Sequence, residues 1–408
     1  MQDALASPEQ ELLLLCARPR LEGDQEERIR ALAAAPLNWP SFLATAGRNA
    51  VLPLLYPHLS RLCWNALPGP CAESLRTFHQ NNQLRGLRLT AELIRVIELL
   101  HANQIPAIPY KGPALAASLY GDVALREYWD LDILVRPEDM VRVKQVLLAA
   151  GYLPGISLGP AQEKSLLRFG CERHFCSPDG QSILEVHWRI TAKNHSLDFG
   201  PTGLWTGLQP ISLSGSSLPQ FSAENYLLVL CVHGGKHAWK CLSWVCDVAE
   251  MLRKHRDLDW ELMFERARSV GAERLLALGL HLAENLLGAT ACPDLRSRVQ
   301  RDPAIQSLAA EARESMLRHD APATRPLELF WFFLRSRERW ADRLRCALRV
   351  VLMPELSDWQ AVNLPSGAHG LYPLVRVVRL LGKYSLGRMR GTPRRNLPAS
   401  GAETFRNE

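Results

Sequence analysis

Two aspartates stand two positions apart in the otherwise apolar segment from Asp130 to Val135. An extended strand turns alternate side chains to opposite faces, so we expect Asp130 and Asp132 on one face and the apolar residues on the other. Adjacent carboxylates repel each other unless a proton or a cation neutralises them, and their hard oxygen atoms suit Mg²⁺ or Mn²⁺. The alternative is a pair of solvent-facing carboxylates on an edge strand.

A third carboxylate stands in a second short apolar segment, from Ile183 to Trp188. Alternation places Glu185 and His187 on one face of that strand. If both strands belong to one small sheet, Asp130, Asp132 and Glu185 form a site for two divalent cations, which clamp the attacking and leaving oxygen atoms of a phosphoryl transfer. We therefore predict these three acids as metal ligands and catalytic residues. His187 either contacts this site or forms a hydrogen bond within the sheet.

A glycine turn precedes the aspartates. The segment from Ile105 to Tyr110 is short and punctuated by prolines, which predicts a strand, and Pro113 predicts the first turn of a helix to Tyr120. Gly112 lets the backbone approach a phosphate closely, and the free N–H groups of a new helix favour an anion. Lys111 would add positive charge beside a triphosphate. A simple turn is the alternative.

Two further polar residues lie close to these segments in the chain. Arg126 either reaches a phosphate or pairs with Asp122 or Glu127. His174 lies on a strand predicted from Cys171 to Cys176, and it could face the same site as the acids.

A polar patch interrupts the apolar helices of the C-terminal half, from His233 to His237 and on to Lys240. Its two histidines, four positions apart, could bind zinc, but the glutamate of a metalloprotease helix is missing between them. Contacts to phosphates or bases, and polar packing between helices, are the alternatives. Of this patch, we predict Lys236 and Lys240 as contacts of a triphosphate.

The surrounding pattern predicts an α+β protein. Apolar residues at helical spacing cover residues 7–65, 71–103 and most of the chain after Ser222, including a basic helix from about Arg335 to Leu352. Short strands and helices lie between, with a hairpin turn at Pro178-Asp179-Gly180. The predicted division is a helical segment 1–70, an α/β domain 71–215, a helical domain 216–390 and a disordered tail 391–408. The long helix 71–103 is predicted to bury Leu84, Leu87, Leu89, Leu93, Ile94, Ile97 and Leu100.

Composition excludes several classes of protein. The chain has 408 residues, of which 47% are hydrophobic and 22% charged, so it is neither disordered nor a small disulfide-stapled protein. It contains no apolar stretch of about 18 residues, the length needed to cross a bilayer. The first residues lack a signal-peptide pattern, and we read the ten cysteines as reduced thiols of a cytoplasmic protein.

The positive charge is concentrated near the end of the chain. The net charge is +6, yet residues 331–408 alone carry 14 Lys and Arg against 6 Asp and Glu. This excess either meets a polyanion or solvates helix faces. Nucleic-acid binding would use Arg376, Arg379, Lys383, Arg388, Arg390, Arg394 and Arg395.

The order of a glycine turn, a helix, an Asp-x-Asp strand and a later acidic strand resembles the DNA polymerase beta-like nucleotidyltransferase superfamily. More closely, the chain resembles the bacterial "uncharacterised nucleotidyltransferase" family from about residue 30 to 385. The resemblance rests on the stretches 110–116, 119–122, 125–126, 130–139, 184–188, 233–239, 244–247, 354–359 and 364–372.

The resemblance implies a small mixed-sheet nucleotidyltransferase domain between helical segments. It also implies Mg²⁺-dependent transfer of a nucleoside monophosphate from a nucleoside triphosphate, most simply ATP, to an acceptor. Asp130 and Asp132 would hold the metals, Glu185 would share the catalytic metal and help to deprotonate the acceptor hydroxyl, and Gly112 would lie under the triphosphate.

The chain departs from the superfamily at one position. The superfamily usually has Gly-Gly or Gly-Ser where this chain has Lys111-Gly112. The alternative function is therefore a degenerate module that binds a nucleotide or a partner without chemistry. For an enzyme, the acceptor could be a small molecule, a peptide, a protein side chain or RNA.

Overall fold

The computed structural model describes residues 7–200, 203–318, 326–354, 356–362, 364 and 366–385, and it confirms the α+β class. The predicted tail 391–408 lies outside these residues. Helices α1 and α3 begin at capping side chains, because Ser7 and Asn38 accept hydrogen bonds from backbone N–H groups of the first turns. The first five helices are α1 (Pro8–Cys16), α2 (Gln25–Ala33), α3 (Trp39–Arg48), α4 (Leu52–Leu62) and α5 (Gly69–Ala102).

A five-stranded mixed sheet forms the centre of the α/β unit, with strand order β1-β2-β5-β4-β3. Strands β2 and β5 are parallel, and the other neighbours are antiparallel. The predicted hairpin joins β4 to β5, where Gly180 has φ of +71° and the Ser177 N–H donates to the carbonyl of Ser182. The elements are β1 (Ala107–Pro109), α6 (Gly112–Tyr120), β2 (Asp130–Val135), α7 (Met140–Ala149), β3 (Leu153–Pro154), α8 (Pro160–Phe169), β4 (Glu172–Cys176) and β5 (Ile183–His187).

A small hairpin that was not predicted, β6 (Gln209–Leu213) with β7 (Ser216–Gln220), leads into the C-terminal helices. These are α9 (Ala223–Lys236), α10 (Leu242–Lys254), α11 (Trp260–Val270), α12 (Glu273–Leu287), α13 (Leu295–Arg301), α14 (Pro303–Leu317), α15 (Pro326–Arg335), α16 (Trp340–Leu352), α17 (Leu356–Ala361) and α18 (Tyr372–Ser385). In the described part of the chain, none of the helices combines the length and apolarity of a membrane span.

The basic helix predicted from Arg335 to Leu352 is wrong at its start. Helix α15 ends at Arg335 and α16 begins at Trp340. The guanidinium of Arg274 donates to the carbonyls of Arg335 and Arg337, at 2.7 and 2.6 Å. A continuous helix would use these carbonyls internally, so a contact from a distant helix interrupts the backbone here.

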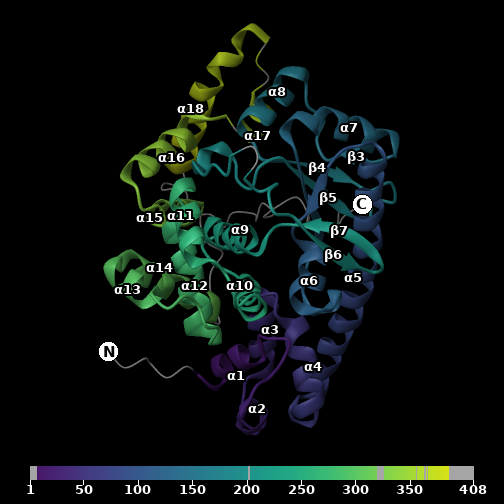
Figure 1. The fold of residues 1–408 in the computed structure, drawn as a ribbon, viewed down its shortest axis with the longest axis vertical. Helices are drawn as coiled ribbons and strands as arrows, with labels where there is room; N and C mark the ends of the chain where they lie inside the picture. Colours follow the sequence, from purple (N-terminus) through teal and green to yellow (C-terminus); the bar gives the residue numbers. More distant parts are fainter. Residues whose placement is uncertain are drawn as a thin grey trace.

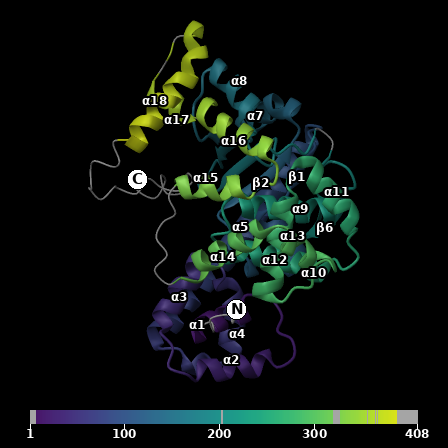
Figure 2. The same cartoon turned by 90° about the vertical axis from the view of Figure 1, so that its left-hand side faces the viewer.

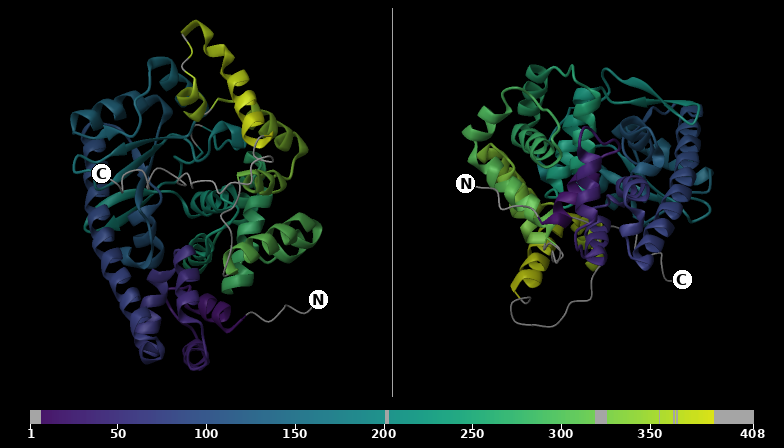
Figure 3. Two further views of the ribbon diagram at one scale, coloured as in Figure 1. Left: turned by 180° about the vertical axis from the view of Figure 1, so that it is seen from behind. Right: turned by 90° about the horizontal axis from the view of Figure 1, so that it is seen from below.

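Two apolar cores hold the structure together. The smaller lies between the central sheet, α5 and α7, and the larger joins α1–α4 to α9, α10, α12 and α14. Figure 1 shows α5 running along one side of the molecule, with the sheet beside its C-terminal half and α1–α4 at its other end. Figures 2 and 3 show the C-terminal helices on the opposite side. The N-terminal helices α1–α4 and the C-terminal helices therefore share one core. The domain boundaries predicted at residues 70, 215 and 390 stay predictions.

The buried stripe predicted for α5 is wrong at two positions. Leu84 and Leu87 are 68% and 62% exposed, whereas Leu89 and Leu93 are fully buried. Over these turns the inward positions belong to small or polar residues, Asn82, Gly86 and Thr90, which face the segment 122–128. Asn82 donates to backbone carbonyls of this segment, and Gly86 makes room for the Tyr128 hydroxyl and Val123. Hydropathy alone does not reveal such contacts, so it places this part of the stripe on the wrong side.

The glycine pair of the His233–His237 patch serves packing. A Cβ added to Gly234 would lie 2.5 Å from the ring of Trp239, and one added to Gly235 would lie 2.2 Å from Leu275. Trp239 is completely buried in the larger core. The two glycines are therefore required for packing, because α9 lies too close to Trp239 and Leu275 for a side chain at either position.

We expect Gly234→Ala to lower the free energy of unfolding by about 1–3 kcal/mol, because overpacking a rigid core forces a shift. Gly47→Ala in α3 is the matched control, since its new Cβ would meet only Leu52, at 3.6 Å. Urea unfolding followed by circular dichroism measures both variants. Equal stability of the two variants would contradict the packing role.

Candidate active site

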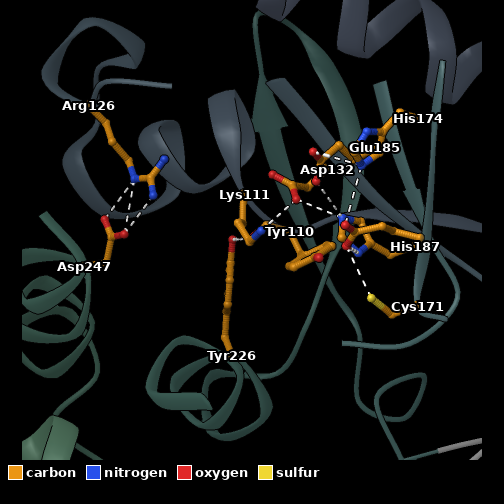
Figure 4. A network of polar contacts seen from close by, with 11 residues as sticks. Tyr110, Lys111, Arg126, Asp132, Cys171, His174, Glu185, His187, Tyr226 and Asp247 are labelled. Atoms are coloured by element: carbon orange, nitrogen blue, oxygen red, sulfur yellow. Dashed lines mark hydrogen bonds and ion pairs between the residues drawn. The ribbon is translucent and has the colours of Figure 1, made fainter. Parts of the chain in front are cut away.

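The three predicted acids lie on neighbouring parallel strands. In the register of β2 and β5, Asp132 lies beside Glu185, and Asp130 is on the same face two residues earlier. The side chain of Asp132 is 2% exposed and that of Glu185 is 15% exposed. Figure 4 shows Asp132 and Glu185 side by side, with His187 next to them.

Asp132 is the most enclosed of these acids, and two cationic groups hold it. The Nζ of Lys111 lies 2.7 Å from its Oδ1, and the Nε2 of His187 lies 3.0 Å from the same oxygen. Burial opposes ionisation, but Lys111 and His187 outweigh it and lower the pKa of Asp132. In turn, burial opposes the charge of Lys111, yet Asp132 and Glu185 raise its pKa to about 12. The ion pair is therefore charged near neutral pH.

Asp130 has the opposite electrostatic situation. Burial, together with the negative charges of Asp132 and Glu185, raises the pKa of Asp130 to about 7. This carboxyl group has no cation in direct contact among the described residues. A positive ion beside it would relieve the repulsion, which is the behaviour expected of a cation ligand.

Two residues of β4 extend the cluster, and one of them, Glu172, was missed by sequence reasoning. The β4–β5 register places Glu172 beside His187 and His174 beside Glu185. The Nε2 of His174 lies 3.3 Å from Glu185 and 3.5 Å from Glu172. The signal existed in the sequence, because a tight turn centred on Asp179-Gly180 fixes this register.

Three groups of side chains offer donor atoms within 4.8 Å of one another in the described ranges. They are Asp132 with Glu185 and His187, Glu172 with His174 and Glu185, and Cys171 with Glu172 and His187. Asp130 belongs to none of them. The structure thus brings a cation-binding set together around Glu185 and His187, while Asp130 stands at its edge.

The glycine turn lies directly beside the acids. Gly112 has φ of +56°, and a Cβ there would lie 3.2 Å from the carbonyl of Asp130. Only glycine combines this conformation with so close an approach. Lys111 precedes the first turn of α6, and the Tyr226 hydroxyl donates to the carbonyl of Tyr110 at 2.6 Å, which ties the turn to α9.

Arg126 pairs with neither Asp122 nor Glu127. Its Nε and Nη2 donate to both carboxylate oxygens of Asp247 in α10, at 2.9–3.2 Å, and Asp247 also accepts from the Tyr120 hydroxyl. Both members of the pair are buried. The predicted phosphate contact of Arg126 stays a prediction, but most of its guanidinium is already engaged in joining α10 to the chain before β2.

The other predicted contacts divide between two places. Burial raises the pKa of Glu172, but His174, His187 and Lys236 together lower it below its usual range, so Lys236, at the end of α9, lies within electrostatic reach of β4. Lys240 faces Glu328 instead, while burial lowers its pKa. The rings of His233 and His237 pack against each other and Trp244, and burial lowers both pKa values well below the usual range. Neither belongs to a donor group within the described residues.

The basic C-terminal residues are only partly described. Arg376 and Arg379 both bind Asp358, and Arg376 is buried. The four arginines predicted after residue 385 lie outside the described residues. Nucleic-acid binding through this region stays a prediction.

A glycine-turned helix start beside carboxylates on adjacent strands of a small mixed sheet is an arrangement suited to nucleotidyl transfer. The sequence matches the protein family described as "Uncharacterised nucleotidyltransferase" over residues 35–288, and the chain belongs to that family. No curated protein and no solved structure matches it.

We expect Asp247→Asn to lower the free energy of unfolding by about 3–5 kcal/mol, because Arg126 would keep its buried charge without a counter-ion. Glu311→Gln removes one charge from an exposed pair with Arg335 and should cost no more than about 1 kcal/mol. Denaturant unfolding measures both. Equal losses would show that the Arg126–Asp247 pair is no structural tie.

Proposed function

We propose that the protein is a Mg²⁺-dependent nucleotidyltransferase that moves a nucleoside monophosphate from a nucleoside triphosphate, ATP in the first instance, to an acceptor. The observation that carries the proposal is the register that sets Asp132 beside Glu185, with Asp130 on the same face and Gly112 against the Asp130 backbone. Family membership supports the general kind of activity.

The chemistry of the donor set fits the proposed metal. Asp130, Asp132 and Glu185 offer hard carboxylate oxygens, and the raised pKa of Asp130 marks negative charge that the protein side chains do not balance. These three acids would hold Mg²⁺ or Mn²⁺. When bound, divalent cations neutralise developing charge on the phosphate oxygens and orient the attacking and leaving groups in a two-metal arrangement.

The chain itself supplies positioning. The free N–H groups at the start of α6 favour the triphosphate, and the absence of a Cβ at Gly112 lets it approach. Lys111 can exchange its contact with Asp132 for a phosphate oxygen once cations occupy the acids, since both contacts are ionic. Glu185 is 15% exposed, against 2% for Asp132, and would accept the proton of the acceptor hydroxyl. Lys236 and Arg126 are the further proposed contacts of the nucleotide, and Arg126 would reach it with the part of its guanidinium that Asp247 does not bind.

The acceptor remains open among a small molecule, a peptide, a protein side chain and RNA. The ten cysteines are all free thiols, which supports the proposed cytoplasmic location.

One observation favours the alternative, a nucleotide- or partner-binding module without catalysis. Lys111 stands where the superfamily usually has a small residue, and its ammonium group already forms an ion pair with the carboxylate of Asp132. A resident ammonium ion could replace one of two divalent cations, and a site with a single cation would bind a triphosphate without transferring from it.

We expect Asp130→Asn, Asp132→Asn and Glu185→Gln each to lower turnover by about a hundredfold or more, because each removes charge that stabilises the transition state. Release of pyrophosphate, together with transfer of label from α-labelled triphosphates into a cell lysate, measures the activity. Glu138→Gln, an exposed acid just after β2, is the matched control and should keep full activity. Unchanged turnover in all three variants would end the proposal.

Lys111→Met separates the enzyme from the binding module. As a triphosphate contact, the ammonium group should contribute about 1.5–3 kcal/mol, so its loss should raise KM for the triphosphate about tenfold or more while kcat changes less. Lys144→Met in α7, which pairs with Glu163, controls for loss of a lysine. If the alternative holds, the wild-type protein releases no pyrophosphate and Lys111→Met binds Mg²⁺ more tightly.

A further inference from the structure

The side of His187 that faces away from Asp132 holds a nitrogen without a hydrogen bond, next to Glu172. His187 is only 3% exposed, and its Nδ1 atom has no hydrogen-bond partner among the described residues. The ring cannot easily turn, because Tyr110 packs edge-on against it at 5.3 Å. Because this nitrogen is buried and forms no hydrogen bond, a metal ion can take the place of its proton.

The nearest groups to this nitrogen are a carboxylate and a thiol. The Oε2 of Glu172 lies 3.3 Å from the Nδ1, and the Sγ of Cys171 lies 3.3 Å from the same oxygen. All three donor atoms lie within 4.8 Å of one another. Zinc bonds of about 2.0–2.3 Å in tetrahedral geometry place their donor atoms about 3.3–3.5 Å apart, so the spacing suits a bound ion.

The other ring nitrogen supports the same arrangement. The Nε2 of His187 lies 3.0 Å from Asp132 and can keep its proton and this contact when a metal ion replaces the proton on Nδ1. A histidine that binds a metal through one nitrogen and a carboxylate through the other is a common pairing in metal sites.

We propose that Cys171, Glu172 and His187 bind a transition-metal ion of the zinc class, with water as the fourth ligand. The thiolate selects such an ion over Mg²⁺, and the 30% exposure of Glu172 leaves solvent access for the water. The site adjoins the proposed magnesium site through His187, but its ligands Cys171 and Glu172 are not among the three acids of that site. It would fix the ring of His187 and, through it, the orientation of Asp132. It goes beyond the proposed transfer reaction and does not depend on it.

Cobalt(II) is the probe, because a cobalt–thiolate bond gives a charge-transfer band in the near ultraviolet. After chelation and dialysis, we expect the full-length protein to bind about one equivalent of Co²⁺ with this band, and Zn²⁺ to abolish it while millimolar Mg²⁺ does not. Cys171→Ser should lose the band, and Cys176→Ser should keep it. Cys176 is the matched control, since it ends β4, the strand that directly follows Cys171, and belongs to none of the donor groups.

Glu172→Gln provides a second test at a partly exposed position that the fold does not require. We expect its Zn²⁺ affinity, measured by competition with a chromogenic chelator, to fall by at least about tenfold. Asp132→Asn should keep the thiolate band, which separates this site from the magnesium site. Absence of the band in the wild-type protein, or its persistence in Cys171→Ser, would overturn the proposal. Both readouts are independent of nucleotidyl transfer, so this proposal and the proposed function can fail separately.

Discussion

The crowding of carboxylates on three adjacent strands is the constraint on which the rest of the structure depends. Asp130, Asp132 and Glu185 face one side of β2 and β5, and Glu172 joins them from β4. Carboxylates withdrawn from water each cost several kcal/mol unless positive groups compensate them. Lys111 and His187 compensate Asp132 from opposite sides, whereas Asp130 stays partly protonated near neutral pH. The site is therefore built to receive cations.

Hydrophobic burial in the two cores offsets the unfavourable free energy of crowding these carboxylates. On the far side of the sheet from the acids, Leu131, Ile133 and Val186 are fully buried and pack with the apolar residues of α5 and α7. On the near side, the larger core anchors α9 and α10, which hold the glycine turn through Tyr226 and the chain before β2 through Asp247. The acids are thus held by hydrophobic burial elsewhere and not by their own interactions.

Much of the site was readable from the sequence because it is encoded locally. Period-two alternation placed the acids of β2 and β5 on common faces, and the Asp179-Gly180 turn fixed the β4–β5 hairpin. The same alternation, carried across the hairpin, places Glu172 of β4 beside His187 of β5. Glu172 is absent from the residues predicted above, because that prediction used the two acidic strands only. Hydropathy failed on α5, where Leu84 and Leu87 are exposed. There the helix meets backbone carbonyls and the Tyr128 hydroxyl, and the spacing of apolar residues within a helix does not show what packs against it.

The sequence by itself determined the local features, namely the strand faces, the positive-φ glycine at position 112 and the starts of the capped helices. These follow from the backbone and from residues a few positions apart. The tertiary structure decided which distant groups meet, such as Arg126 with Asp247, 121 positions apart, and Lys111 with Asp132. It also placed a break between α15 and α16, where Arg274 binds the carbonyls of Arg335 and Arg337. Such pairs depend on how whole helices pack against the sheet, and packing is set by the sum of many weak contacts that no local pattern records.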